Sequence, residues 1–187
     1  GFNLGGTKSG RLSSSEPNLT NIPSKGTRYA TPIKKAFQAP PPNHGDSGWL
    51  MIGADFASLE DRISALQTKD PNKLKIYTDG YDGHCLRAYK YFGSKMPGIV
   101  ETVDSINSIE TLFPDLRQLS KSPTFLLTYM GTWKGLIRQF GFKEAVAKQI
   151  EKNYHELYSV SDTWIKEQIE EAAKCGYATL AFGLRLR

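Results

Sequence analysis

Residues 49–62 read W-L-M-I-G-A-D-F-A-S-L-E-D-R and decide the expected fold. The apolar residues 49–52 are typical of a short buried strand, and Asp55 stands at its carboxyl end. Enzymes that mix helices and strands often place metal-binding carboxylates at strand ends, so we expect Asp55 at a functional corner. Taken alone, the D-x-x-x-x-E pattern is weak, and it also fits a solvated loop followed by an ordinary charged helix face.

After Asp55 the pattern changes from strand to helix. Ser58 and Asp61 are expected to form a capping box at the helix start. Glu60 and Arg62 then fall on the first turns, where one ligand could touch Asp55 and Glu60 together. The apolar residues recur four and then three positions apart, which predicts a buried face made of Leu59, Ile63 and Leu66.

The composition limits the possible classes of protein. The chain has 187 residues, 39% of them hydrophobic, and a formal net charge of +5, which favours an anionic partner. The positive charge is concentrated before residue 40, where Glu16 is the single acidic residue beside six basic ones: Lys8, Arg11, Lys25, Arg28, Lys34 and Lys35. Cys85 and Cys175 lack metal-site spacing and suggest a reducing compartment. We expect no membrane segment, because no apolar run approaches about 18 residues.

The order of elements along the chain predicts loops first and helices later. Residues 1–48 are rich in Gly, Ser, Pro and Asn, which predicts loops with a weak strand at 33–39 and a turn at 40–48. Helices are expected at 82–92, 114–129 and 133–140, with a loop at 94–108. Two long amphipathic helices follow, with buried stripes at Val146, Ile150, Tyr154 and Leu157 and then at Ile165, Ile169 and Ala172, before a strand at 177–182.

A second group of functional candidates recurs every four residues: Arg117, Lys121, Phe125 and Tyr129. On a helix this spacing turns each side chain by about 40° from the last, so the four share one face. Two cations followed by two rings suit a nucleoside triphosphate, because the cations neutralise phosphate and the rings pack on sugar and base. The alternative is a half-buried helix with aromatic core residues and solvated basic ones. Pro123 would kink such a helix.

The order of these motifs resembles the DNA polymerase I-like, or family A, DNA polymerases. The opening element G-R-L-S-S then P-N-L-x-N-I-P stands at residues 10–14 and 17–23, and the first catalytic motif, D-x-x-x-x-E-x-R, at 55–62. The fingers-helix motif, R-x-x-x-K-x-x-x-F-x-x-x-Y, is at 117–129, and a D-x-H element ends at His84. Pro-Thr-Phe at 123–125 resembles the replicative enzymes of tailed phages.

The resemblance implies a template-directed DNA polymerase that uses two Mg²⁺ ions, with primer-template DNA and dNTPs as partners and possible replication accessory proteins. It implies that Asp55 is the metal ligand, and that Lys121 binds phosphate and donates a proton to pyrophosphate. The remaining nucleotide contacts it implies are Glu60 beside the sugar C2′, His84 and Arg117 on phosphate, Phe125 on the sugar and Tyr129 holding Glu60. The implied minor-groove and template contacts are Arg11, Asn18 and Asn21.

The resemblance also implies an α+β fold: part of a palm with a short antiparallel sheet, plus helical fingers. We expect palm residues at 1–68, fingers at 69–175 and a returning strand at 176–187. The family's H-D-E motif, with the second metal aspartate, has no match in this sequence, so we expect a fragment that extends no primer by itself. Thr20 also stands where the family usually has glutamine. The alternatives are a non-catalytic DNA- or nucleotide-binding module and a single-subunit RNA polymerase. A phage enzyme would act in the bacterial host cytoplasm.

Overall fold

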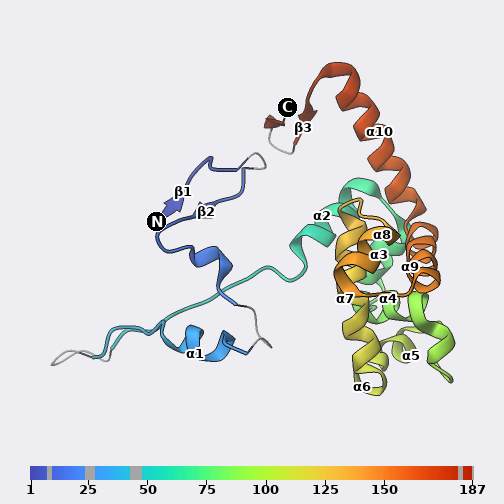
Figure 1. Cartoon of the computed structure of the whole chain (residues 1–187), viewed down its shortest axis with the longest axis horizontal. Helices are drawn as coiled ribbons and strands as arrows, with labels where there is room; N and C mark the ends of the chain where they lie inside the picture. Colours follow the sequence, from blue (N-terminus) through green and yellow to red (C-terminus); the bar gives the residue numbers. More distant parts are fainter. Residues whose placement is uncertain (8–9, 24–27, 43–47, 181–182, 187) are drawn as a thin grey trace. The chain divides into compact units, whose positions relative to one another are not determined.

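The computed structural model describes residues 1–7, 10–23, 28–42, 48–180 and 183–186. The chain forms two compact units, one made of Gly1–Phe56 with Cys175–Arg187 and one made of Ala57–Lys174. We call them the N-terminal unit and the helical unit, and each is described by itself (Figure 1).

The helical unit is built from nine helices among its described residues, together with a 3₁₀ turn at Gly93–Lys95. In chain order they are α2 (Leu59–Thr68), α3 (Pro71–Thr78), α4 (Gly83–Phe92), α5 (Val103–Asn107), α6 (Ile109–Leu112), α7 (Pro114–Thr128), α8 (Trp133–Phe140), α9 (Glu144–Leu157) and α10 (Ser159–Cys175). The helices predicted at 82–92, 114–129 and 133–140 are therefore confirmed to within a residue of their ends.

Helix α4 lies at the centre of this unit and packs against α7 and α9 (Figure 1). Its residues Leu86, Ala88 and Phe92 are buried, and they meet Ile150 and Leu157 of α9 in one hydrophobic core. Burying one such large apolar side chain stabilises the fold by about 1.5–3 kcal/mol. The predicted stripe on α9 is confirmed, because it faces this core.

Two aspartates fix the starts of the helices around this core. The Asp70 carboxylate accepts the backbone N–H groups of Asn72 and Lys73 at the start of α3, and Asp82 accepts that of Cys85 at the start of α4. Such caps satisfy backbone donors that lack partners inside the helix. Gly141 ends α8 in the left-handed conformation, with φ of 70°, as its position after the last apolar residue predicts.

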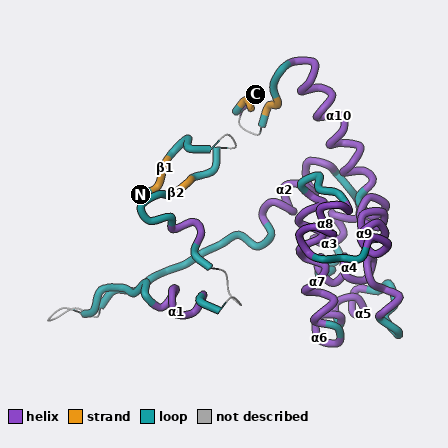
Figure 2. Tube along the Cα trace, viewed as in Figure 1, coloured by secondary structure: helices purple, strands orange, loops and turns teal. Residues whose placement is uncertain are grey.

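The N-terminal unit has little regular structure, as its composition predicts (Figure 2). Strand β1 (Phe2–Asn3) pairs antiparallel with β2 (Ser13–Ser14), and β3 (Ala178–Thr179) pairs antiparallel with β4 (Arg185–Leu186). A 3₁₀ turn at Leu19–Asn21 and the short helix α1 (Ala30–Lys35) complete its described elements. Helices with short antiparallel ladders make the chain α+β, as predicted.

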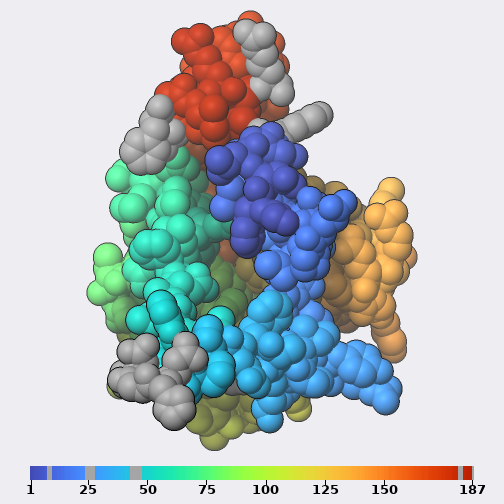
Figure 3. Space-filling view, turned by 90° about the vertical axis from the view of Figure 1, so that its left-hand side faces the viewer, coloured from blue at the N-terminus to red at the C-terminus, as the bar shows by residue number. Residues whose placement is uncertain are grey.

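The predicted buried strand at residues 49–52 is wrong. These residues adopt no regular structure, and their side chains are exposed, up to 93% for Ile52. In the space-filling view the segment in the colour of these residues lies at the surface (Figure 3). A strand needs a neighbouring strand to satisfy its backbone groups, and among the described residues none pairs with this segment.

Helix α2 forms where predicted but buries the opposite face. Leu59, Ile63 and Leu66 are exposed, whereas Ala65 and Thr68 are buried. The capping box is also wrong: Ser58 is left-handed, with φ of 53°, and makes no side-chain cap. The expected partner of Ser58, Asp61, instead bonds to Arg87 and Tyr77, and this polar attachment turns the small-residue face inward.

Three further expectations fail for identifiable reasons. Residues 33–39 contain the end of α1 instead of a strand; Pro32 fits the first turn of a helix, where its missing N–H costs nothing. The expected loop at 94–108 contains α5. Ile169 of α10 is exposed and Ile165 and Ala172 are only half-buried, because α10 extends beyond the other helices (Figure 1). Most of the turn predicted at 40–48, and the end of the strand predicted at 177–182, lie outside the described residues.

Candidate functional site

The two rings on α7 are surface groups. Phe125 is 66% exposed and Tyr129 56%, and their ring centroids lie 4.9 Å apart at an interplanar angle of 58°. The alternative interpretation, in which these aromatics belong to the core, is therefore wrong. Pro123 is buried inside α7, and the helix continues across it from Pro114 to Thr128. Rings on an exposed helix face can stack on a planar ligand.

Arg117, on the same face of α7 as the two rings, forms ion pairs with acidic neighbours. Its Nη2 lies 2.6 Å from Asp82 Oδ2 and 3.4 Å from Glu110 Oε1. Burial alone would raise the pKa of Asp82, but the hydrogen bonds from Arg117 and from the Cys85 N–H lower it to about 2. Arg117 Nε is buried without a hydrogen-bond partner. Part of this guanidinium is thus committed to holding α4 against α7.

His84, Lys121 and Phe125 line one hollow of about 450 Å³ between α4, α7 and α8. The other lining residues are Ser122, Leu126, Gln139 and Phe140. Lys121 Nζ donates to the neutral Gln118 Oε1 over 2.9 Å, so the hollow has a cationic wall. Burial, together with the charges of Arg87, Lys121 and Arg117, lowers the pKa of His84 to about 4, so its ring is neutral at pH 7. A neutral imidazole can donate one hydrogen bond to an anion without adding charge.

Glu60 and Tyr129 meet across two helices. The Tyr129 hydroxyl donates to Glu60 Oε2 over 2.7 Å, which joins the first turn of α2 to the end of α7. This is the contact that the family resemblance implies between these residues. The carboxylate is thereby held close to the exposed rings of α7.

Asp55 belongs to the N-terminal unit, where its side chain is exposed. The part of the chain that the structure describes contains no group of three or more His, Cys, Asp or Glu side chains able to hold a metal. A carboxylate oxygen is the kind of ligand that Mg²⁺ takes, but one such group does not make a two-ion site.

The expected DNA contacts lie in the same unit as Asp55. Arg11, Asn18 and Asn21 are all exposed. Asn18 Oδ1 accepts hydrogen bonds from the hydroxyls of Ser14 and Thr20, at 2.9 and 2.7 Å. Thr20, where the family usually has glutamine, therefore has a local role in bracing Asn18.

Sequence reasoning missed the residues that hold the site together. Asp82 caps α4 and binds Arg117, and its place as the first residue of the helix predicted at 82–92 was the available signal. Asp61 and Arg87 form an ion pair with 2.6 Å between Oδ2 and Nη2. The hydrophobic periodicity does not predict that Arg87 is buried, because Arg87 is a charged residue on the buried side of α4.

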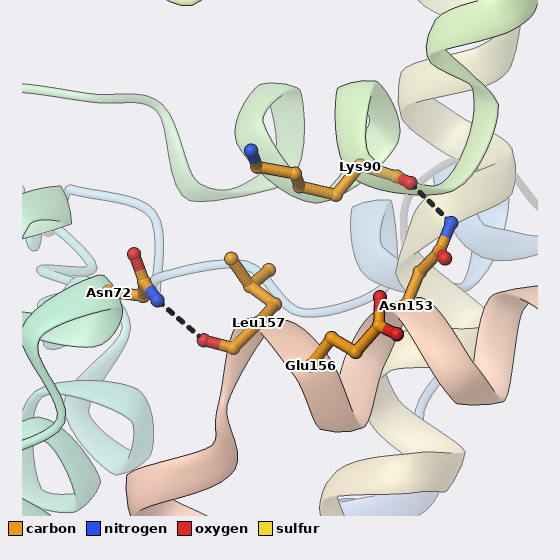
Figure 4. A pocket seen from close by; sticks show the side chains of 5 residues that line it. All are labelled: Asn72, Lys90, Asn153, Glu156 and Leu157. Carbon is orange, nitrogen blue, oxygen red and sulfur yellow. Dashed lines mark hydrogen bonds between the residues drawn. The ribbon is translucent and has the colours of Figure 1, made fainter.

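A second hollow, of about 270 Å³, lies against α3, α4 and α9 (Figure 4). Asn72 Nδ2 donates to the Leu157 carbonyl over 2.7 Å, and Asn153 Nδ2 donates to the Lys90 carbonyl over 2.6 Å. Both amides are therefore occupied in joining helices, and none of the predicted site residues lines this hollow.

Comparison with known proteins identifies the class of this chain. The sequence model described as DNA polymerase family A matches residues 1–187, so the chain belongs to that family. It is similar to "DNA polymerase I, thermostable" of Thermus filiformis (31% identity) and of Thermus caldophilus (32%), covering 98% of this chain and 20% of each relative. DNA polymerase I of Chloroflexus aurantiacus is 29% identical, over 98% of this chain and 17% of that protein.

A solved structure shares the fold. It is described as the POL domain of Pol1 from M. smegmatis in complex with DNA primer-template and dNTP, and it matches with a TM-score of 0.72 and 26% identity. The match covers 98% of this chain and 29% of that one. The chain thus spans about a fifth of the length of the curated relatives and under a third of the solved domain. In the part of the chain that the structure describes, no helix has the length and apolar character needed to cross a bilayer.

Proposed function

We propose that this chain supplies the nucleotide-binding fingers and part of the catalytic palm of a template-directed DNA polymerase. The observation that carries the proposal is the hollow in which His84, Lys121 and Phe125 come together. Membership of the family supports it, as does the solved relative, whose description includes primer-template and dNTP. The substrate of this hollow is then the incoming deoxynucleoside triphosphate.

The phosphate end of the nucleotide is assigned to the cationic wall. Lys121 would bind the triphosphate and donate a proton to the leaving pyrophosphate, because it is the ammonium group that lines the hollow. His84 would donate one neutral hydrogen bond to a phosphate oxygen. The Nη2 group of Arg117 already donates to Asp82. Arg117 would therefore bind phosphate through its other N–H groups.

The sugar end is assigned to Glu60, Phe125 and Tyr129. Glu60 would stand beside the sugar C2′, where a ribonucleotide hydroxyl clashes with the carboxylate or leaves it badly paired. The hydrogen bond from Tyr129 supports this role, because it fixes the carboxylate next to the rings. Phe125 would pack on the sugar, and its lack of a hydroxyl favours substrates that carry a 3′ hydroxyl.

Asp55 is proposed as one ligand of two Mg²⁺ ions. When bound, these ions supply Lewis-acid chemistry at the primer 3′ oxygen and the triphosphate. The described residues offer only part of such a site, so Asp55 needs a second acidic residue of the kind found in the H-D-E motif. We therefore expect the 187-residue chain alone to extend no primer.

Primer-template DNA is proposed to meet the N-terminal unit. Arg11 and Asn18 would approach the minor groove near the primer end, where every base pair offers an acceptor, and Asn21 would support the template. Pro-Thr-Phe at 123–125 favours the tailed-phage replicative branch. The enzyme would then work in the bacterial host cytoplasm, together with replication accessory proteins.

Primer extension by the full-length product of the gene that encodes this chain tests the proposal. We expect extension with dNTPs, its loss in Asp55→Ala with DNA binding retained, and no change in the control Asp104→Asn, an exposed carboxylate of α5. DNA binding without any extension would favour a non-catalytic module. Extension with ribonucleotides in place of deoxynucleotides would favour an RNA polymerase, and either result would refute the proposal.

A further inference from the structure

Glu60 lies on helix α2, whose apolar stripe of Leu59, Ile63 and Leu66 does not pack against the rest of the helical unit. Leu59, Ile63 and Leu66 are exposed, and only Ala65 and Thr68 of this helix are buried. Apolar burial normally fixes the rotation of an amphipathic helix about its axis. Here that contribution is small, so polar contacts must set which way α2 faces.

The residue next to Glu60 makes two such contacts. Asp61 Oδ2 accepts from Arg87 Nη2 over 2.6 Å and from the Tyr77 hydroxyl over 2.7 Å. Arg87 is buried in α4 and also donates to the Tyr158 hydroxyl over 2.8 Å. Tyr77 in turn lies under the Arg62 guanidinium, 4.4 Å from the ring centroid. One carboxylate oxygen thus attaches the first turn of α2 to both α3 and α4.

We propose that Asp61 is a positioning residue for sugar selection, which it controls by fixing the direction of Glu60. This inference rests on the proposed role of Glu60 beside the sugar. Adjacent residues on a helix point about 100° apart, so Asp61 and Glu60 attach α2 to different neighbours. Any rotation of α2 that moved Glu60 away from Tyr129 would also draw Asp61 out of its contact with Arg87.

The same contact couples the two ends of the nucleotide site. Arg87 stands three residues after His84 on α4, so the two side chains lie on neighbouring positions of one helix. The group that orients the sugar-facing helix is therefore anchored on the helix that presents a wall of the phosphate hollow.

Two substitutions weaken the attachment without touching Glu60. Asp61→Asn keeps the shape but removes the charge, and Tyr77→Phe removes one hydrogen bond and leaves the buried Arg87 paired with Asp61. The measurement is the ratio of kcat/KM for a dNTP to that for the matching rNTP, in the full-length gene product. We expect the ratio to fall about fivefold in Asp61→Asn and about threefold in Tyr77→Phe, since Asp61→Asn removes the ion pair with Arg87, whereas Tyr77→Phe removes one hydrogen bond to the carboxylate and keeps that ion pair.

A merely structural role is excluded by three further readouts. The kcat for dNTPs should stay near that of the wild type, and Asp61→Glu, which restores the carboxylate, should recover part of the ratio. The control Ile150→Val lowers stability from the α9 core, far along the chain from α2, and should leave the ratio unchanged. If Ile150→Val lowers the ratio as much as Asp61→Asn at matched Tm, the inference is overturned.

The outcomes separate this inference from the proposed function. If Glu60→Ala leaves ribonucleotide exclusion unchanged, the assigned role of Glu60 fails and the inference fails with it. If Glu60→Ala relaxes exclusion but folded Asp61→Asn and Tyr77→Phe do not, only the inference is refuted. Should Asp61→Asn not fold, Tyr77→Phe decides alone, because it leaves the Arg87 ion pair in place.

Discussion

Replacing Asp82 should destabilise the helical unit, because Asp82 makes two contributions to its stability that different substitutions can separate. Its carboxylate caps α4 through the Cys85 N–H at 2.8 Å and also binds Arg117 at 2.6 Å. Asparagine caps helices about as well as aspartate, whereas alanine does not. Asp82→Asn therefore removes the ion pair alone, and Asp82→Ala removes the ion pair and the cap.

The magnitude follows from how deeply the pair is buried. The side chain of Arg117 is 18% exposed and that of Asp82 is 28% exposed. Exposed pairs contribute about 0–1 kcal/mol, and breaking a fully buried pair costs about 3–5 kcal/mol. We therefore expect about 1–2 kcal/mol for Asp82→Asn, because Glu110 remains near Arg117. Losing the cap adds about 1 kcal/mol, giving about 2–3 kcal/mol for Asp82→Ala.

Urea unfolding of the 187-residue chain at pH 7, followed by far-UV circular dichroism, measures both free energies. A nucleotide-binding titration on the same variants then tests whether dNTP affinity changes together with stability. Removing the acidic partner of Arg117 should not weaken dNTP binding, although it lowers stability. Equal unfolding free energies for wild type, Asn and Ala would refute the assigned packing role. Loss of dNTP binding in the folded Asn variant would contradict the expectation for dNTP binding and show that the ion pair orients Arg117 for the ligand.

Three other predictions concern the site and the core. Lys121→Ala should lower kcat/KM for dNTPs at least about tenfold, through both KM and kcat, because a cation on the phosphate is lost. The control Lys134→Ala, which removes an exposed lysine of α8, should leave kcat/KM unchanged, and steady-state primer extension compares the two variants. Lowering the pH from about 6.5 towards 4 should reduce the unfolding free energy, because in this range His84 takes up a proton in the unfolded chain but not in the folded one. In His84→Gln this part of the pH dependence of the unfolding free energy should be absent. Burial raises the pKa of the Cys85 thiol to about 11, so iodoacetamide should modify the exposed Cys175 first, and equal rates seen by mass spectrometry would contradict this.

Local sequence patterns were sufficient to predict several of the helices and the family. Helices α4, α7 and α8 follow from their periodicity and from the glycines at their ends, which act within a few residues. The spacing of Arg117, Lys121, Phe125 and Tyr129 likewise placed these four on one helix, because helical geometry is local. The order of the motifs indicated DNA polymerase family A, and the comparison confirmed it.

The buried face of α2 and the conformation of residues 49–52 depended on tertiary contacts. Periodicity marked Leu59, Ile63 and Leu66 of α2 as the buried stripe, but Asp61 turned that helix the other way by binding Arg87. The residues at 49–52 are apolar enough for a strand, yet a strand exists only where a second strand pairs with it. Both outcomes depend on partners distant in sequence, and the pattern of one segment contains no information about them.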